Sequence, residues 1–499
     1  MAKWPITPPS VPDLSRITNL AQEIRDAASN IADYARGSSL RLGVSGLSRA
    51  GKTVFITSLI HNLQRGGRLP VLHAYAEGRL LSARLEQQPD DAVPSFAYGE
   101  HVAALTGGAA GPSARVWPQS TRQISQLRLT LEFERTSTWR KGRGELTIDI
   151  VDYPGEWLLD LPLLEKSYDQ WSRETLEAAA AAARASIAAP WRGYLATLEP
   201  AAPFDEMTAR QAAELFTAYL RGAKAESFAL SALTPGRFLM PGDLEGSPAL
   251  TFSPLHSDEG ATHPAGSLAA LMERRYEAYK THVVKPFFRD HFARLDRQIV
   301  LVDALGALNS GPAAVRDLET ALSDVLSAFR IGRSNLLTQI FRPKIDRVLF
   351  AATKADHLHH TSHDALEAIL RQLVARAITR TQSGGVDFDV IAMAAVRATR
   401  EASVSHDGRN LEAIIGTPMA GERLGDELFD GSSEAAIFPG QLPDDPRAAF
   451  RGEGLGARDG ETDYRFLRFR PPLTKSPDAP LPHIRLDRAL QFLFGDKLA

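Results

Sequence analysis

The residues best suited to chemistry are the eight at 46–53, GLSRAGKT, which fit the pattern G-x-x-x-x-G-K-[ST] between an apolar run and a helical stretch. Glycines in such a turn let backbone N–H groups converge on phosphate oxygens, and the start of the next helix adds partial positive charge. Lys52 would reach the β- and γ-phosphates of a nucleotide, and the Thr53 hydroxyl would bind Mg²⁺. The predicted phosphate-binding residues are Gly46, Ser48, Arg49, Ala50, Gly51, Lys52, Thr53 and Val54.

A second motif, DYPG at 152–155, directly follows the strand-like run LTIDIV. We call residues 46–53 the phosphate loop. If the strand LTIDIV lies beside the strand that leads into this loop, Asp152 can hold Mg²⁺ through water. Gly155 would then donate its N–H to the γ-phosphate. Taken alone, a D-x-x-G sequence is also a common turn, so its interpretation depends on the other motifs.

A third motif, TKAD at 353–356, ends the apolar run RVLFAA. The Asp356 carboxylate can accept two hydrogen bonds from a guanine base, which an adenine base cannot supply. Thr353 and Lys354 would border the base, and the backbone N–H groups of Ala395 and Val396 would meet the guanine O6. The alternative is that Asp356 caps the next helix.

The composition excludes several classes of protein. The 499 residues contain 57 Lys plus Arg, 60 Asp plus Glu and no Cys, for a formal net charge of −3. This balance argues against a nucleic-acid binder. The absence of Cys excludes disulfides, thiolate metal sites and cysteine nucleophiles. Without a signal peptide or a long apolar segment, the sequence predicts a cytoplasmic protein with no transmembrane segment.

Six short apolar runs are candidate strands, at 40–46, 124–134, 145–151, 298–305, 346–353 and 388–396. The runs at 124–134 and 145–151 alternate apolar and polar residues and predict a hairpin. Residues 157–297 are instead rich in helix-forming residues, apart from a long Pro/Gly-rich loop at about 230–265. The predicted fold is therefore α/β, a mostly parallel sheet flanked by helices, with a large helical insertion.

The three motifs in this order match the GTPase pattern of the Ras-like P-loop superfamily. With the insertion ahead of TKAD, VWPQST before the hairpin and PGRFLMPG inside the insertion, the chain resembles the YcjX-like family of bacterial GTP-binding proteins. The resemblance implies GTP or GDP with Mg²⁺ as ligands. It also implies a link to bacterial envelope or phage-shock stress, with a membrane-associated stress protein as partner and a peripheral position at the inner membrane.

The corresponding domain boundaries divide the chain into five parts. These are an N-terminal amphipathic helix (1–36), the first part of a GTPase domain (37–156), a helical insertion domain (157–297), the second part of the GTPase domain (298–400) and a C-terminal extension packing on that domain (401–499). The apolar stripe of the first part, at 13–35, is expected to pack on the chain's own domain. The alternative is that it docks on a partner or a membrane surface.

The resemblance also points to a switch threonine ahead of the strand that pairs with the DYPG strand. Thr121 is the candidate, with Ser120 as second choice; its hydroxyl would complete the Mg²⁺ shell. Alternatively, Thr121 simply starts a strand. The Gly-rich segment 106–123 would be the switch that GTP orders.

Two residues depart from the Ras-like pattern and bear on catalysis. Glu156 stands where many such GTPases place a Gln that orients the attacking water. A carboxylate beside the γ-phosphate would repel it, so hydrolysis is expected to be slow. Arg49 lies where guanylate-binding proteins carry an arginine that can act in cis, and self-association could bring it inward. Alternatively, Arg49 is a solvated loop charge.

Four histidines follow TKAD, namely His357, His359, His360 and His363. They fit no metal-ligand motif and are interpreted as an exposed loop. The predicted function is a GTP-dependent switch with slow hydrolysis. The alternatives are an ATP-dependent P-loop kinase or ATPase, which TKAD disfavours, and a GTP-dependent scaffold with negligible hydrolysis, which Glu156 favours.

Overall fold

The computed structural model describes most of the chain. The described residues are 39–47, 49–88, 90–119, 123–136, 142–225, 228–256, 263–328, 345–381, 386–406, 409–451 and 466–499. The predicted helix at 13–35, together with Ser48, Ser120 and Thr121, lies outside them. Among the described helices, none is both long enough and apolar enough to cross a membrane.

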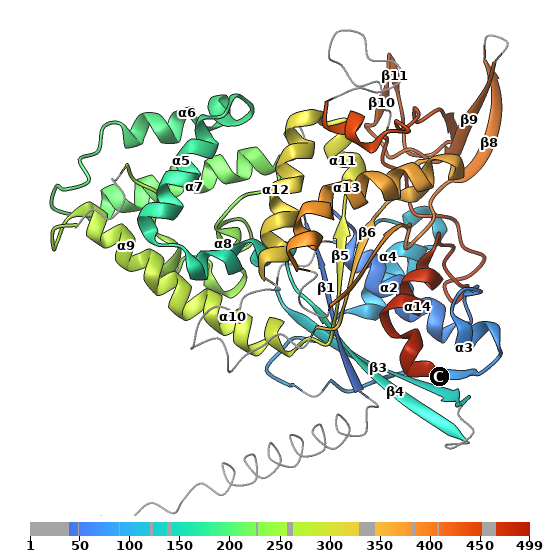
Figure 1. Cartoon of the computed structure of the whole chain (residues 1–499). Helices are drawn as coiled ribbons and strands as arrows, with labels where there is room; N and C mark the ends of the chain where they lie inside the picture. The colour runs from blue at the N-terminus through green and yellow to red at the C-terminus, as the bar shows by residue number, and fades with distance from the viewer. Residues whose placement is uncertain are drawn as a thin grey trace, which may run out of the picture.

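A seven-stranded sheet forms the centre of the molecule, in the order β2-β3-β4-β1-β5-β6-β7 (Figure 1). The strands are β1 (Ser39–Gly46), β2 (Leu80–Glu86), β3 (Ser125–Glu134), β4 (Arg143–Asp152), β5 (Arg297–Val302), β6 (Arg347–Ala352) and β7 (Asp387–Ala392). All run parallel except β3, which is antiparallel to both β2 and β4. The predicted α/β class and the predicted hairpin are confirmed.

Helices cover both faces of this sheet because its central strands are apolar on both sides. On one face lie α2 (Lys52–Gln64) and α14 (Leu486–Phe494), packed against side chains such as Leu42 of β1 and Leu349 of β6. On the other face lie α12 (Pro312–Ala328) and α13 (His363–Thr381). The shorter helices α3 (His73–Ala76), α4 (Tyr98–Thr106) and α11 (Ala304–Asn309) lie in the connections.

The segment between β4 and β5 is helical, as its composition predicts, and projects to one side of the sheet (Figure 1). It comprises the 3-10 segment η3 (Gly155–Glu165), α5 (Tyr168–Ala180), α6 (Ala182–Leu195), α7 (Glu206–Lys224), α8 (Gly236–Leu239), α9 (Leu268–Tyr279) and α10 (Lys285–Asp290). Aromatic residues fill its interior: Trp171 stacks on Tyr276 with ring centroids 5.0 Å apart, and Trp191 stacks on Tyr219 at 5.3 Å.

The C-terminal part forms a small sheet of β12 (Ala435–Ile437), β9 (Arg409–Gly416) and β8 (Arg400–His406), and a short hairpin of β10 (Arg423–Leu424) and β11 (Glu427–Leu428). A single antiparallel bridge joins Phe469 to Pro418. The structure adds β2, β8 and β9, which the sequence reading did not foresee. The five-part domain division stays a prediction.

Candidate functional site

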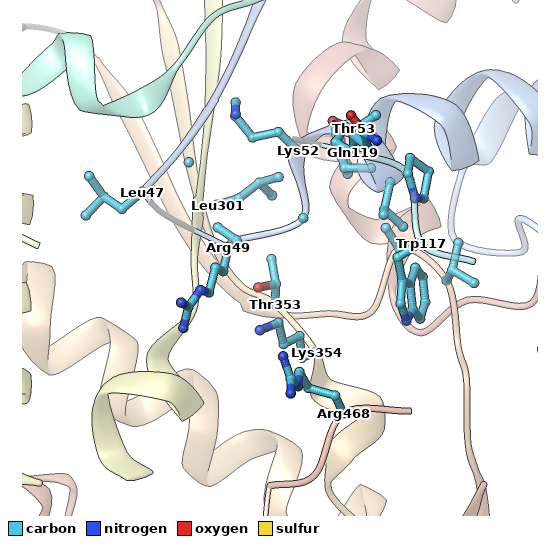
Figure 2. Close-up of a pocket in the computed structure, with 18 of the residues that line it drawn as sticks. Leu47, Arg49, Lys52, Thr53, Trp117, Gln119, Leu301, Thr353, Lys354 and Arg468 are labelled. Atoms are coloured by element: carbon cyan, nitrogen blue, oxygen red, sulfur yellow. Dashed lines mark hydrogen bonds between the residues drawn. The ribbon is translucent and has the colours of Figure 1, made fainter. Parts of the chain in front are cut away.

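A cavity of about 830 Å³ opens at the carboxyl ends of β1, β5, β6 and β7 (Figure 2). Ligands of open parallel sheets bind at this edge. Its lining includes these predicted site residues: Gly46, Arg49, Ala50, Gly51, Lys52, Thr53, Val54, Glu156, Thr353, Lys354, Asp356, Ala395 and Val396. Segments some 300 residues apart in the sequence thus border one space. Of the second motif, Asp152 and Gly155 are not part of this lining, whereas the next residue, Glu156, is.

The phosphate loop joins β1 to α2 through a sharp turn. Gly51 has φ 78°, a left-handed conformation that favours glycine, and precedes the first residue of α2. No described side chain caps this helix, so its first N–H groups are open to an anion in the cavity. The Thr53 hydroxyl donates to the carbonyl of Gln119 at 3.3 Å, which places it beside the segment that leads to the predicted switch threonine.

Arg49 lines the cavity, but its side chain takes a different direction from that of Lys52. Its backbone φ is 62°, and Figure 2 shows its guanidinium pointing away from the Lys52 ammonium. A role for Arg49 at the γ-phosphate would therefore need the side chain to turn, and stays a prediction.

The DYPG motif lies directly behind the phosphate loop. Asp152 is the last residue of β4, is 1% exposed and pairs in register with Val44 of β1. Gly155 packs so closely on Gly46 that a Cβ atom would lie 2.2 Å from the Gly46 carbonyl oxygen. No side chain larger than hydrogen fits there. Asp152 and the Thr53 hydroxyl are hard oxygen donors of the kind that Mg²⁺ prefers.

Glu156 forms an ion pair that the sequence did not predict. Lys224, the last residue of α7, donates from Nζ to Glu156 Oε1 at 2.6 Å. Burial opposes the charged form of Glu156, but Lys224 and Lys52 outweigh it and hold its pKa below the ordinary value. Lys224 and Arg221 both line the cavity. The helical insertion therefore contributes two cations to the cavity lining.

The residues after Glu156 pack on the insertion through polar contacts. The Asp160 carboxylate accepts hydrogen bonds from the backbone N–H groups of Gly236 (2.7 Å) and Arg237 (3.3 Å) and from the Tyr279 hydroxyl (2.6 Å). Burial raises the pKa of Asp160 to about 6. The Arg237 guanidinium lies 3.3 Å from the ring centroid of Trp157. The PGRFLMPG sequence thus anchors η3 to the insertion.

At the opposite end of the cavity, TKAD is held by the chain that follows β7. Asp356 is 4% exposed, and its Oδ2 accepts a hydrogen bond from the Ala398 N–H at 2.8 Å. The Asp356 carbonyl accepts one from the Thr399 hydroxyl. Lys354 pairs with Asp303, which follows β5. Asp356 lies in a short 3-10 turn and does not cap α13, the helix that begins at His363.

The backbone next to Ala395 and Val396 is fixed on two sides. Ala394 and Ile484 exchange both backbone hydrogen bonds, at 3.1 and 2.9 Å, and Arg397 donates its backbone N–H to Pro482 at 2.7 Å. From α2, the Ser58 hydroxyl donates to the Ala395 carbonyl. The end of the chain thus determines the position of the segment expected to meet a guanine O6.

Further cavity residues were missed by the sequence reading, among them Trp117, Met419, Arg468 and Phe469. The Trp117 indole N–H donates to the Phe469 carbonyl at 2.6 Å, and Arg115 Nε donates to Pro471 at 2.6 Å. The 115–117 part of the predicted switch segment is therefore docked on the C-terminal extension. Whether it responds to a nucleotide stays a prediction.

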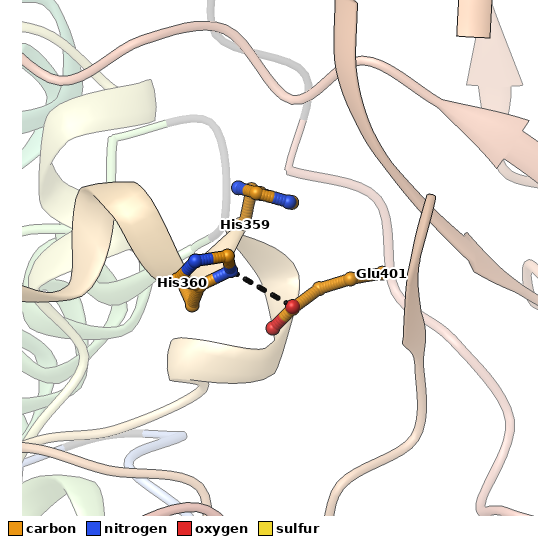
Figure 3. A group of neighbouring side chains, drawn as sticks. All are labelled: His359, His360 and Glu401. Atoms are coloured by element: carbon orange, nitrogen blue, oxygen red, sulfur yellow. Dashed lines mark hydrogen bonds and ion pairs between the residues drawn. The ribbon is translucent and has the colours of Figure 1, made fainter. Parts of the chain in front are cut away.

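The exposed-loop interpretation of the histidines is wrong for three of the four, because His357 and His359 are half-buried and His363 is buried. His363 is 4% exposed and lies 2.8 Å from the Ala355 carbonyl, and His357 lines the cavity beside the Phe469 ring. Burial lowers the pKa of both. His360 is exposed and lies 2.8 Å from Glu401, with His359 adjacent (Figure 3). This pair of histidines lies outside the cavity and connects the start of α13 to β8.

Comparison with known proteins places the chain in a family. The family model described as "YcjX-like family, DUF463" matches residues 40–498. A protein named "Ras-like GTPase YcjX" from Escherichia coli K12 is 39% identical over 471 residues, covering 92% of this chain and 96% of the relative. A protein of the same name from Shewanella oneidensis MR-1 is 35% identical over 488 residues, covering 92% and 94%. The chain therefore belongs to the YcjX-like family.

Proposed function

We propose that this chain binds GTP with Mg²⁺ and hydrolyses it slowly to GDP and phosphate, as a nucleotide-dependent switch. The proposal rests mainly on one observation. The phosphate loop, the residue after DYPG, and TKAD with the segment after β7 all border one cavity at the carboxyl edge of the sheet. The relatives named as Ras-like GTPases support the same activity.

In this proposal, the start of α2 and Lys52 bind the β- and γ-phosphates. Thr53 and Asp152 would hold Mg²⁺, with the predicted Thr121 completing its shell. When bound, the metal ion neutralises charge that builds up on the phosphate oxygens. A water oxygen forms a bond to the γ-phosphorus while the bond from that phosphorus to the bridging oxygen breaks, which leaves GDP and inorganic phosphate.

Asp356 gives the proposed preference for guanine. Its carboxylate is buried and oriented by the Ala398 N–H, with Ala395 and Val396 on the adjacent cavity wall. A buried acceptor rejects a base that lacks the matching donors. The test is displacement of a fluorescent GDP analogue by unlabelled nucleotides. GTP and GDP should displace it, and ATP should not; equal displacement by ATP would favour the kinase or ATPase alternative.

Slow hydrolysis is expected because Glu156, and not Gln, follows the DYPG motif, and Glu156 is committed to an ion pair. The pairing of Glu156 with Lys224 also keeps the scaffold alternative open. Single-turnover hydrolysis of bound GTP separates the two: measurable conversion to GDP supports a GTPase, and none supports a scaffold.

The wider biological role in this proposal rests on the family. It comprises a cytoplasmic switch that reaches the inner membrane through a membrane-associated stress protein in the envelope or phage-shock response. Co-purification with inner-membrane proteins from stressed cells, with GTP analogue or with GDP, tests this part. Nucleotide-independent recovery would argue against a switch.

A further inference from the structure

The helical insertion contributes two cations, Arg221 and Lys224, to the lining of the cavity. Arg221 and Lys224 lie three residues apart at the end of α7, so they share one side of the helix. Lys224 is already directed at this site, because its Nζ lies 2.6 Å from Glu156. Arg221 is exposed and makes no ion pair with any residue that the structure describes.

The charge of Glu156 creates a conflict that these cations can resolve. Glu156 directly follows Gly155, the residue packed on the phosphate loop. Its side chain is 9% exposed, and its lowered pKa keeps it ionised. A γ-phosphate arriving in the same cavity adds further negative charge, which a buried carboxylate would repel strongly at short range. Lys224 lies where it can interact with either anion.

We propose that Lys224 is a γ-phosphate-binding residue supplied by the helical insertion: it pairs with Glu156 when GDP is bound and donates to the γ-phosphate when GTP is bound. This inference rests on the proposed GTP function and deepens it. A phosphate oxygen carries more charge than a carboxylate oxygen and accepts strong hydrogen bonds from ammonium groups. Arg221, three residues earlier on the same helix, adds positive charge to the cavity lining.

When Lys224 exchanges Glu156 for the γ-phosphate, the change would be transmitted to the rest of the helical insertion. The residues after α7 lie close to Glu156 as well. Leu239 and Met240 line the cavity. Gly236 packs so closely on Glu156 that a Cβ atom on Gly236 would lie 2.0 Å from the Glu156 carbonyl oxygen. A shift of Glu156 or Lys224 therefore acts directly on α8. The insertion is in this way part of the nucleotide site as well as a structural neighbour.

A double-mutant cycle tests the proposal and separates it from simple neutralisation of Glu156. The variants are Glu156→Gln, Lys224→Ala and the combination, and the measurement is affinity for GDP and for a non-hydrolysable GTP analogue with Mg²⁺. Removing Lys224 in the Glu156→Gln background should weaken binding of the analogue about tenfold or more and leave GDP affinity within about twofold. In this background no buried carboxylate is left without its partner, so folding is protected.

If Lys224 only neutralises Glu156, removing it from the Glu156→Gln background will change neither affinity, and the proposal is overturned. Arg210→Ala is the matched control, because Arg210 is an exposed cation of the same helix outside the cavity lining; it should bind both nucleotides as the wild type does. Absence of guanine-nucleotide binding by the folded wild type would instead refute the proposed function itself.

Discussion

The two ends of the cavity are built differently. At the phosphate side, Glu156 is held by an ion pair with Lys224, and the η3 segment behind it is fixed by the Asp160 carboxylate. At the base side, Asp356 and the 394–397 segment are held by hydrogen bonds to backbone groups of neighbouring chain. A charged phosphate can draw Lys224 away from Glu156, whereas hydrogen bonds between backbone groups do not respond in this way. The Lys354–Asp303 ion pair at the base side meets an uncharged base. The difference indicates a fixed base side and a phosphate side that can respond to its ligand.

The largest expected effect comes from the phosphate loop. Lys52→Ala should abolish nucleotide binding, because it removes a contact made in the bound ground state. Calorimetric titration with GDP and with a GTP analogue measures this. Lys285→Ala removes an exposed lysine outside the cavity and should bind as the wild type does. Retained nucleotide binding by Lys52→Ala would show that this loop does not bind the phosphates.

The base side is tested by Asp356→Asn. The exchange replaces one acceptor at the base edge with a donor, which suits xanthine better than guanine. We expect GTP affinity to fall about 100-fold and xanthosine triphosphate affinity to rise. Nucleotide displacement measures both. An unchanged base preference would show that TKAD does not read the base.

The anchoring of η3 should depend on pH through Asp160. The folded protein holds the Asp160 proton more tightly than the unfolded chain does, with a pKa of about 6 against an ordinary 3.8. The contribution of this group to stability is therefore fully present below pH 3.8 and is lost as pH rises to about 6.

Compared with Asp160→Asn, which does not titrate, the wild type should lose up to about 3 kcal/mol of unfolding free energy across that range. Urea unfolding at several pH values measures the difference between the two proteins. A difference that stays constant with pH would contradict the raised pKa of Asp160.

The smallest expected effect concerns Arg49. Arg49→Ala should leave GTP affinity within a few-fold of wild type, yet lower single-turnover hydrolysis about tenfold or more, if the guanidinium turns toward the γ-phosphate in the transition state. A rate that rises with protein concentration would point to self-association as the cause of that turn. Equal turnover by variant and wild type at all concentrations would make Arg49 a solvated loop charge.

Much of this arrangement was predictable because its signals are local. The phosphate loop, its flanking strand and helix, and the strand ends at Asp152 and Thr353 each follow from neighbouring residues. Lys224 was not predictable in the same way. A lysine in the last turn of an amphipathic helix is common for reasons of helix charge alone, and its direction depends on how the whole insertion packs.

Two further features of the structure, the strand β2 and the burial of His363, differ from what the sequence predicts, and for similar reasons. The β2 strand lies at the sheet edge and is largely exposed, so it lacks the apolar run of a central strand. His363 looked like part of a polar loop, but it is the first residue of α13, is buried and lies within hydrogen-bond distance of the Ala355 carbonyl. Long-range packing determines both.

Hydrogen exchange with GDP and with a non-hydrolysable GTP analogue tests the contrast between the two ends most directly. Protection should change between the two states in peptides covering 155–165 and 221–240, and should be the same in peptides covering 353–357 and 394–399. Identical protection at the phosphate side in both states, or a change confined to the base side, would contradict the account.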